Sequence, residues 1–156
     1  MEEKEVGQFV EVLDKMAGLE TAIADLYSAF SKHDGDKEFW NRISNDEMHH
    51  ASNLRKMAGI VMERKGVGFS AGRPFTVEGI MKFIDFVKQR TGEVNDGARD
   101  TKSYFVVANE IEKRLLEDKY HEVLKTVDER YTMLMDKIIR DTEMHVNITD
   151  KKAHPA

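Results

Sequence analysis

Five ionisable side chains fall on helix faces that should be apolar. They are Glu20, Glu47, His50, Glu112 and His145. At about 100° of rotation per residue, each is flanked by hydrophobic side chains on the same face of its predicted helix. An isolated buried carboxylate is costly, so it is normally neutralised or paired with a cation. Three carboxylates and two imidazoles favour one common explanation, because oxygen and imidazole ligands together suit iron, manganese or zinc.

The positions of these residues along their helices agree with a shared site. In an antiparallel hairpin, two residues lie level when they are equally far from the turn. The midpoint of residues 20 and 47 is 33.5, inside the helix-breaking run 33–36, and that of residues 112 and 145 is 128.5, beside a turn expected at 125–128. Glu47 and His50, three residues apart, can also point inward together. If the two hairpins pack level, all five side chains meet at one point.

Each residue also has a simpler interpretation. A single glutamate in an apolar stripe is more often explained by a salt bridge or by a position at the end of the core, so the metal site rests on the five residues taken together. Tyr27, two turns after Glu20, either hydrogen-bonds a ligand or is a core aromatic residue. His49 points about 160° away from Glu47 and is expected at the surface.

Hydrophobic periodicity predicts the helices that carry the site. Apolar residues recur at helical spacing over 6–30, 39–61, 105–123 and 131–148, and over a shorter stretch, 77–87. Asp36 is the expected N-cap of the second helix, and Thr126 opens a Thr-x-x-Glu capping box before the last. The glycine-rich run 66–74 is a connection, and turns are expected at 91–92 and 95–97. We therefore predict an all-α chain with a single domain over 1–156, an antiparallel four-helix bundle whose long crossover contains a short extra helix.

Composition excludes several kinds of chemistry. The 156 residues include no cysteine, which rules out disulfides, thiolate zinc sites, iron–sulfur clusters and a cysteine nucleophile. A net charge of −5 without a basic stripe argues against nucleic-acid binding as the main role. The acidic first five residues do not resemble a signal peptide, and no apolar run approaches the roughly 20 residues of a membrane span. We expect a cytoplasmic protein that binds neither nucleic acid nor membrane.

Three segments carry a family resemblance: LETAIADLY over 19–27, EMHHA over 47–51 and ANEIE over 108–112. Together they resemble the ferritin-like superfamily, specifically its rubrerythrin-like di-iron carboxylate branch. The Glu-x-x-His spacing recurs in di-iron bundles. The resemblance implies a ferritin-like fold without a rubredoxin domain and two bound iron ions, with manganese or zinc as alternatives. It implies as metal ligands Glu20, Glu47, His50, Glu112 and His145.

The chain departs from the family pattern at one position. That pattern has a second Glu-x-x-His, but the residue three before His145 is Thr142, whose neutral hydroxyl is a poor substitute for a bridging carboxylate. Asp141 lies on the inner face and is a candidate sixth ligand. Three carboxylates leave one excess positive charge on two divalent ions. Either Asp141 restores the balance, or an exogenous anion does, or one metal site is weak.

The resemblance implies oxidation of ferrous iron by dioxygen or peroxide, in a peroxide-reducing enzyme or in iron handling. A peroxidase without cysteine needs an external electron donor, and the family implies a homodimer. The sequence assigns no catalytic residue. The alternative is a non-catalytic bundle that serves as a binding or regulatory module with a partial or lost metal site, which Thr142 favours. Zinc hydrolysis is a weaker third interpretation, because nothing marks a substrate pocket or a separate general base.

Overall fold

A computed structural model describes residues 1–155, apart from the side chain of His121. About 79% of the structure is helical, which confirms the all-α prediction. The helices are α1 (Glu3–His33), α2 (Lys37–Glu63), α3 (Val77–Asn95), α4 (Tyr104–Glu117) and α5 (Glu129–Ala153). Two 3₁₀ turns, η1 (Thr101–Ser103) and η2 (Tyr120–Glu122), and two short strands, β1 (Phe69–Ala71) and β2 (Leu124–Thr126), complete the described elements.

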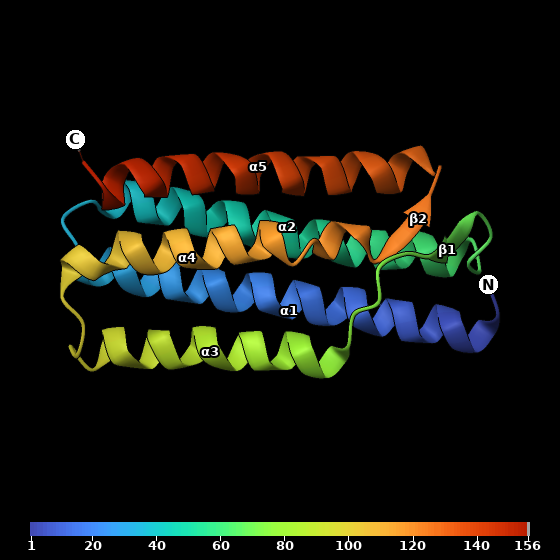
Figure 1. The fold of residues 1–156 in the computed structure, drawn as a ribbon, viewed down its shortest axis with the longest axis horizontal. Helices are drawn as coiled ribbons and strands as arrows, with labels where there is room; N and C mark the ends of the chain where they lie inside the picture. The colour runs from blue at the N-terminus through green and yellow to red at the C-terminus, as the bar shows by residue number, and fades with distance from the viewer. Residues whose placement is uncertain (156) are drawn as a thin grey trace.

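The long helices lie side by side along one axis (Figure 1). α1 packs against α2, α4 against α5, and α2 also packs against α5. Both sequential pairs are antiparallel. α3 lies along α1 and returns the chain to the end of the molecule at which α4 begins (Figure 1). The connection between α2 and α4 therefore spans the molecule. Because α1, α2, α4 and α5 lie side by side, all four can contribute side chains to one interior.

Aromatic packing closes the end of that interior nearest the α1–α2 turn. Trp40 is fully buried and packs against Phe30, with ring centroids 4.7 Å apart, and against Tyr27 at 5.7 Å. Its indole N–H donates to Asp34 Oδ2 at 2.7 Å, which ties the helix to the turn before it. Asp36 is the N-cap of α2 as expected, although its side chain makes no capping hydrogen bond within the described chain.

The sequence prediction was wrong about how the third long helix ends. α4 stops at Glu117, six residues before the predicted end at 123, and Lys119 takes a left-handed conformation with φ 54°. The chain then pairs β2 with β1 in antiparallel register, Phe69 opposite Thr126. Glycines in 66–72 let the connection turn back onto this segment. The paired residues are 53 to 57 positions apart, so the pairing leaves no local periodicity in the sequence that could predict it.

The cap of the last helix also differs from the prediction. Asp128, not Thr126, is the N-cap of α5, and its carboxylate accepts from the backbone N–H groups of Arg130 and Tyr131. The Thr126 hydroxyl instead donates to the carbonyl of Gly68 and accepts from the Asp128 N–H, so it belongs to the strand pairing.

The crossover helix is longer than predicted. α3 continues through 91–92, where the Thr91 hydroxyl donates to the carbonyl of Val87, and ends before Gly97 with φ 72°. Only the second of the two expected turns is therefore a turn, because Gly92 does not adopt a positive φ.

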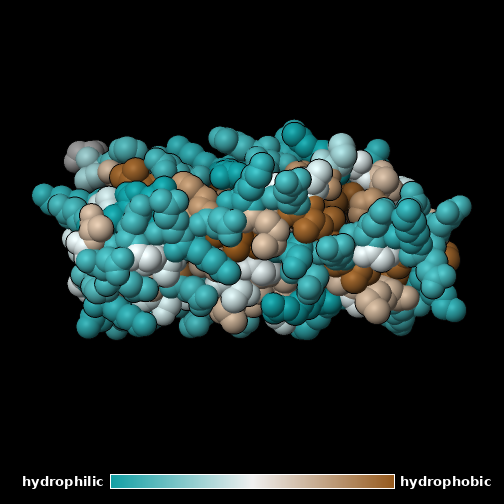
Figure 2. All heavy atoms as spheres, turned by 90° about the horizontal axis from the view of Figure 1, so that it is seen from below, coloured by the Kyte–Doolittle hydropathy of each residue, from teal (hydrophilic) through white to brown (hydrophobic). Residues whose placement is uncertain are grey.

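The face seen from below in Figure 2 is mostly hydrophilic, with smaller apolar areas between the polar side chains. Over the described residues, no helix combines the length and apolarity needed to cross a membrane.

The strand pairing generates a prediction about Gly72. A Cβ at this position would lie 2.0 Å from the carbonyl oxygen of Glu122, so Gly72→Ala must separate the two segments. We expect the free energy of unfolding in urea to fall by about 1–3 kcal/mol. Gly59→Ala is the control, since its Cβ meets no described atom within 4 Å. As a helix-interior replacement it should raise stability by about 0.5–1 kcal/mol. Equal effects of the two substitutions would contradict this account.

Candidate metal centre

The five residues expected to converge do converge, each from the predicted helix. Glu20 comes from α1, Glu47 and His50 from α2, Glu112 from α4 and His145 from α5, and none is more than 5% exposed. Within the described part of the chain, two groups could hold a metal ion, Glu20–Glu47–His50 and Glu47–Glu112–His145. In each group one ligand atom per residue lies within 4.8 Å of the others. Glu47 belongs to both.

Glu47 lies between the two histidines. Its Oε2 is 3.3 Å from Nδ1 of His50, and its Oε1 is 2.9 Å from Nδ1 of His145. Glu20 Oε2 is 3.8 Å from the same nitrogen of His50, and Glu112 Oε1 is 3.3 Å from that of His145. The cluster thus consists of two similar halves that share one carboxylate, which is the position a bridging ligand would occupy.

Each histidine is held from behind by an aspartate of the opposite helix. Nε2 of His50 is 2.9 Å from Asp141 Oδ2 on α5, and Nε2 of His145 is 2.9 Å from Asp46 Oδ2 on α2. When Nε2 carries a proton, its N–H donates to the aspartate, and Nδ1 faces the carboxylate cluster. This carboxylate–histidine arrangement orients imidazoles at metal sites and raises their basicity.

The structure therefore places Asp141 behind His50 rather than among the groups of candidate ligands. Its second oxygen, Oδ1, lies 3.1 Å from Nζ of Lys137, so both carboxylate oxygens have a partner. Asp46 was missed from the sequence, although a signal existed: the Asp-x-x-x-His spacing of 46–50 recurs at 141–145, and again at 150–154 near the end of the last helix. That repeated spacing predicts equivalent helix faces, but not that each aspartate pairs with the histidine of the other helix.

Tyr27 and Thr142 complete the immediate surroundings. The Tyr27 hydroxyl donates to Glu112 Oε1 at 2.8 Å, so this tyrosine is both a core aromatic residue and a partner of a candidate ligand. Thr142 is buried, and its hydroxyl donates to the carbonyl of Ile138 at 2.8 Å. His49 lies on the exposed face of α2, as expected.

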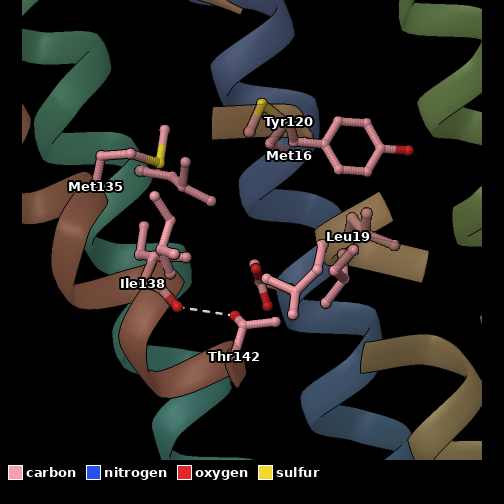
Figure 3. Close-up of a pocket in the computed structure, with 11 residues that line it drawn as sticks. Met16, Leu19, Tyr120, Met135, Ile138 and Thr142 are labelled. Carbon is pink, nitrogen blue, oxygen red and sulfur yellow. Dashed lines mark hydrogen bonds between the residues drawn. The ribbon is translucent and has the colours of Figure 1, made fainter. Parts of the chain in front are cut away.

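A pocket adjoins Glu20 and is lined by side chains of α1, α2, α4, η2 and α5 (Figure 3). Its volume is about 40 Å³. Glu20 and Thr142 form its polar end, and Figure 3 shows the Thr142 hydroxyl bound to the carbonyl of Ile138 there. The other lining residues are mostly aliphatic or sulfur-containing: Met16, Leu19, Leu54, Leu115, Leu116, Tyr120, Met135, Ile138 and Ile139.

The electrostatics of the cluster follow from burial and crowding. Burial raises the pKa of Glu47 well above its ordinary value, and repulsion from Glu112 and Glu20 raises it further. Burial alone would lower the pKa of both imidazoles. The neighbouring carboxylates of Glu20 and Glu47 instead raise the pKa of His50 to about 12, and those of Glu112 and Glu47 raise the pKa of His145 to about 11. The protein without metal therefore holds protons where a metal ion would supply positive charge.

Two carboxylate oxygens test whether these residues fit a metal. Glu20 Oε2 and Glu112 Oε2 are buried, and neither finds a hydrogen-bond donor in the described part of the chain. A buried acceptor without a partner costs about 1–3 kcal/mol. One such oxygen lies in each half of the cluster. Oxygen and imidazole ligands suit iron, manganese or zinc, so the donor set and the two unsatisfied oxygens fit divalent cations.

Comparison with known proteins adds no relative: no family model, curated protein or solved structure matches this chain.

The raised histidine pKa values predict how the metal-free protein responds to pH. An imidazole whose pKa is about 6.5 unfolded and about 11–12 folded stabilises the fold fully below pH 6.5, and this stabilisation is lost as pH rises toward the folded value. Glu47, whose folded pKa is also raised, acts in the same direction. In the presence of EDTA, we expect the free energy of unfolding in urea to fall between pH 6.5 and 9, by on the order of 1 kcal/mol per pH unit.

His145→Gln should make this profile shallower, because one of the two imidazoles is removed, whereas His49→Gln, at an exposed position on α2, should leave its slope unchanged. A wild-type profile as flat as that of His145→Gln would show that the imidazoles do not neutralise the cluster.

Proposed function

We propose that this protein binds two divalent iron ions at the Glu/His cluster and uses them to oxidise ferrous iron with dioxygen or peroxide, as a rubrerythrin-like di-iron protein with a ferritin-like fold. The observation that supports this most is the position of Glu47, whose two oxygens face the inward nitrogens of two histidines in two equivalent groups of ligands. Salt bridges alone do not explain that arrangement, since it leaves buried carboxylate oxygens in both halves without a donor from the described chain.

In this proposal the chain's own residues would hold the two ions and orient the side chains that bind them. Glu47 would contribute to both metal sites, Glu20 and His50 would complete one of them, and Glu112 and His145 would complete the other. Asp141 and Asp46 fix the imidazole tautomers through Nε2. Tyr27 holds a proton against Glu112 Oε1, and burial together with the Glu112 charge keeps the pKa of that phenol well above its ordinary value.

Bound iron would supply the electrons that reduce dioxygen or peroxide. Because the chain has no cysteine, continued turnover requires a separate electron donor. The expected cytoplasmic location and homodimeric assembly belong to the same proposal.

A second candidate function is a binding or regulatory module with one metal ion or none. Thr142 favours it, because the hydroxyl is committed to the Ile138 carbonyl and offers no negative charge. The two functions differ in metal stoichiometry.

The stoichiometry is tested by anaerobic reconstitution with ferrous iron. We expect about two ions per chain, and Glu112→Ala should lose at least one of them because Glu112 and His145 form one half of the cluster. Glu110→Ala is the matched control: this glutamate lies two residues away on α4 and is exposed. Metal content is read from desalted protein. One ion or none in the wild type, unchanged by Glu112→Ala, would support the second candidate instead.

The aspartates behind the histidines provide an independent test. Asp46→Asn and Asp141→Asn each remove a negative charge but keep the size of the side chain. Loss of such a group typically weakens metal binding 10–100-fold. We expect each variant to weaken zinc binding by that factor in a competition titration with a chromophoric chelator. Asp136→Asn, at an exposed position on α5, serves as the control. Unchanged affinity in both variants would mean that the histidines do not bind metal through Nδ1.

A further inference from the structure

The two halves of the cluster are not equivalent at one position. The repeated spacing places Thr142 in α5 where Glu47 lies in α2, since each is three residues before a histidine and one after an aspartate. Glu47 offers two oxygens between the histidines, but the Thr142 hydroxyl points to a backbone carbonyl. A pair of metal ions would thus have one protein bridge where the symmetry of the site provides for two.

No neighbouring acid on α5 supplies the second bridge. Asp141 is bound to His50 and to Lys137, which offsets its charge. Glu143 is exposed. Across the cluster, Asp46 is bound to His145, and its side chain is 34% exposed to solvent. The direct ligands are then three carboxylates, so two divalent ions retain one positive charge.

The pocket in Figure 3 borders Thr142. Thr142 and Glu20 form its polar end, and Glu20 Oε2, nine-tenths or more buried, finds no hydrogen-bond donor among the described residues. Most of the remaining wall is aliphatic, including Leu54 and Ile138. The volume of about 40 Å³ exceeds the roughly 10–15 Å³ that a cavity needs to hold one water molecule, so it admits a small group such as a methyl.

We propose that a small exogenous carboxylate, formate or acetate, binds at Thr142 and bridges the two metal ions. Its two oxygens take the place that Glu47 fills on the other side of the cluster, its charge balances the ions, and its hydrogen or methyl group lies against the aliphatic wall. This inference rests on the proposed function, because without metal ions Glu20 repels an anion.

The test uses protein loaded with Co²⁺ in a buffer without carboxylate, and sodium acetate as the probe. We expect acetate to change the visible absorption of bound Co²⁺ in a saturable manner and to tighten binding of the second Co²⁺ at least tenfold, because the two ligands are linked reciprocally. Formate should act in the same way. Trimethylacetate, whose branched group exceeds the pocket, should act at least tenfold more weakly.

Three variants distinguish the role of residue 142 from the role of the pocket. Thr142→Glu supplies the carboxylate itself, so it should bind two Co²⁺ tightly and lose the acetate response. Thr142→Ser should retain the response. Ile138→Phe fills the pocket without replacing a candidate ligand, and it should weaken the response at least tenfold while two Co²⁺ still bind. Thermal unfolding of each variant confirms that it is folded.

The outcomes separate this inference from the proposed function. Two bound Co²⁺ with no effect of acetate or formate, or an equal response in wild type and Thr142→Glu, would overturn the carboxylate site and leave the di-metal site standing. Fewer than two Co²⁺ in the presence of saturating acetate would overturn both.

Discussion

The structure depends on placing three carboxylates in one buried volume. Glu20, Glu47 and Glu112 repel one another there, and burial removes the water that would screen them. The chain compensates with charge that alternates outward from the centre. In one direction Glu47 is followed by His50, Asp141 and then Lys137, whose side chain is largely exposed. The negative charge at the centre is thus offset by a series of contacts between groups of opposite charge, and the last group of the series is exposed to solvent.

This compensation requires four helices at once. Glu47 and His50 come from α2, but the groups that complete the cluster come from α1, α4 and α5, and each imidazole bonds an aspartate across the α2–α5 contact. A shift of α5 along its axis relative to α2 would break both aspartate–histidine hydrogen bonds together. The same bonds that orient the histidines therefore also fix how these two helices pack.

The two ends of the cluster differ in what they admit. Toward the α1–α2 turn, Tyr27 and Trp40 fill the interior, and the Tyr27 hydroxyl is already bound to Glu112. Toward the β1–β2 end, the walls are aliphatic and leave a pocket that begins at Thr142 and Glu20. The contrast arises from side-chain shape: Trp40 packs its ring against those of Tyr27 and Phe30, whereas the short side chain of Thr142 borders a pocket.

The sequence by itself determined which side chains face the interior and at what height. Rotation of 100° per residue fixes the face of Glu20, Glu47, Glu112 and His145, because it depends only on the local backbone. Glu112 and His145 meet even though α4 ends at Glu117, because the chain after α4 continues through β2 to the end of the molecule at which α5 begins (Figure 1). What only the tertiary structure decided is the partner of each atom: that Asp141 binds the outer nitrogen of His50, that Asp46 does the same for His145, and that β2 pairs with β1. Those contacts join residues 53 or more positions apart, and their geometry follows from how whole helices and strands register against one another, which no local pattern of residues encodes.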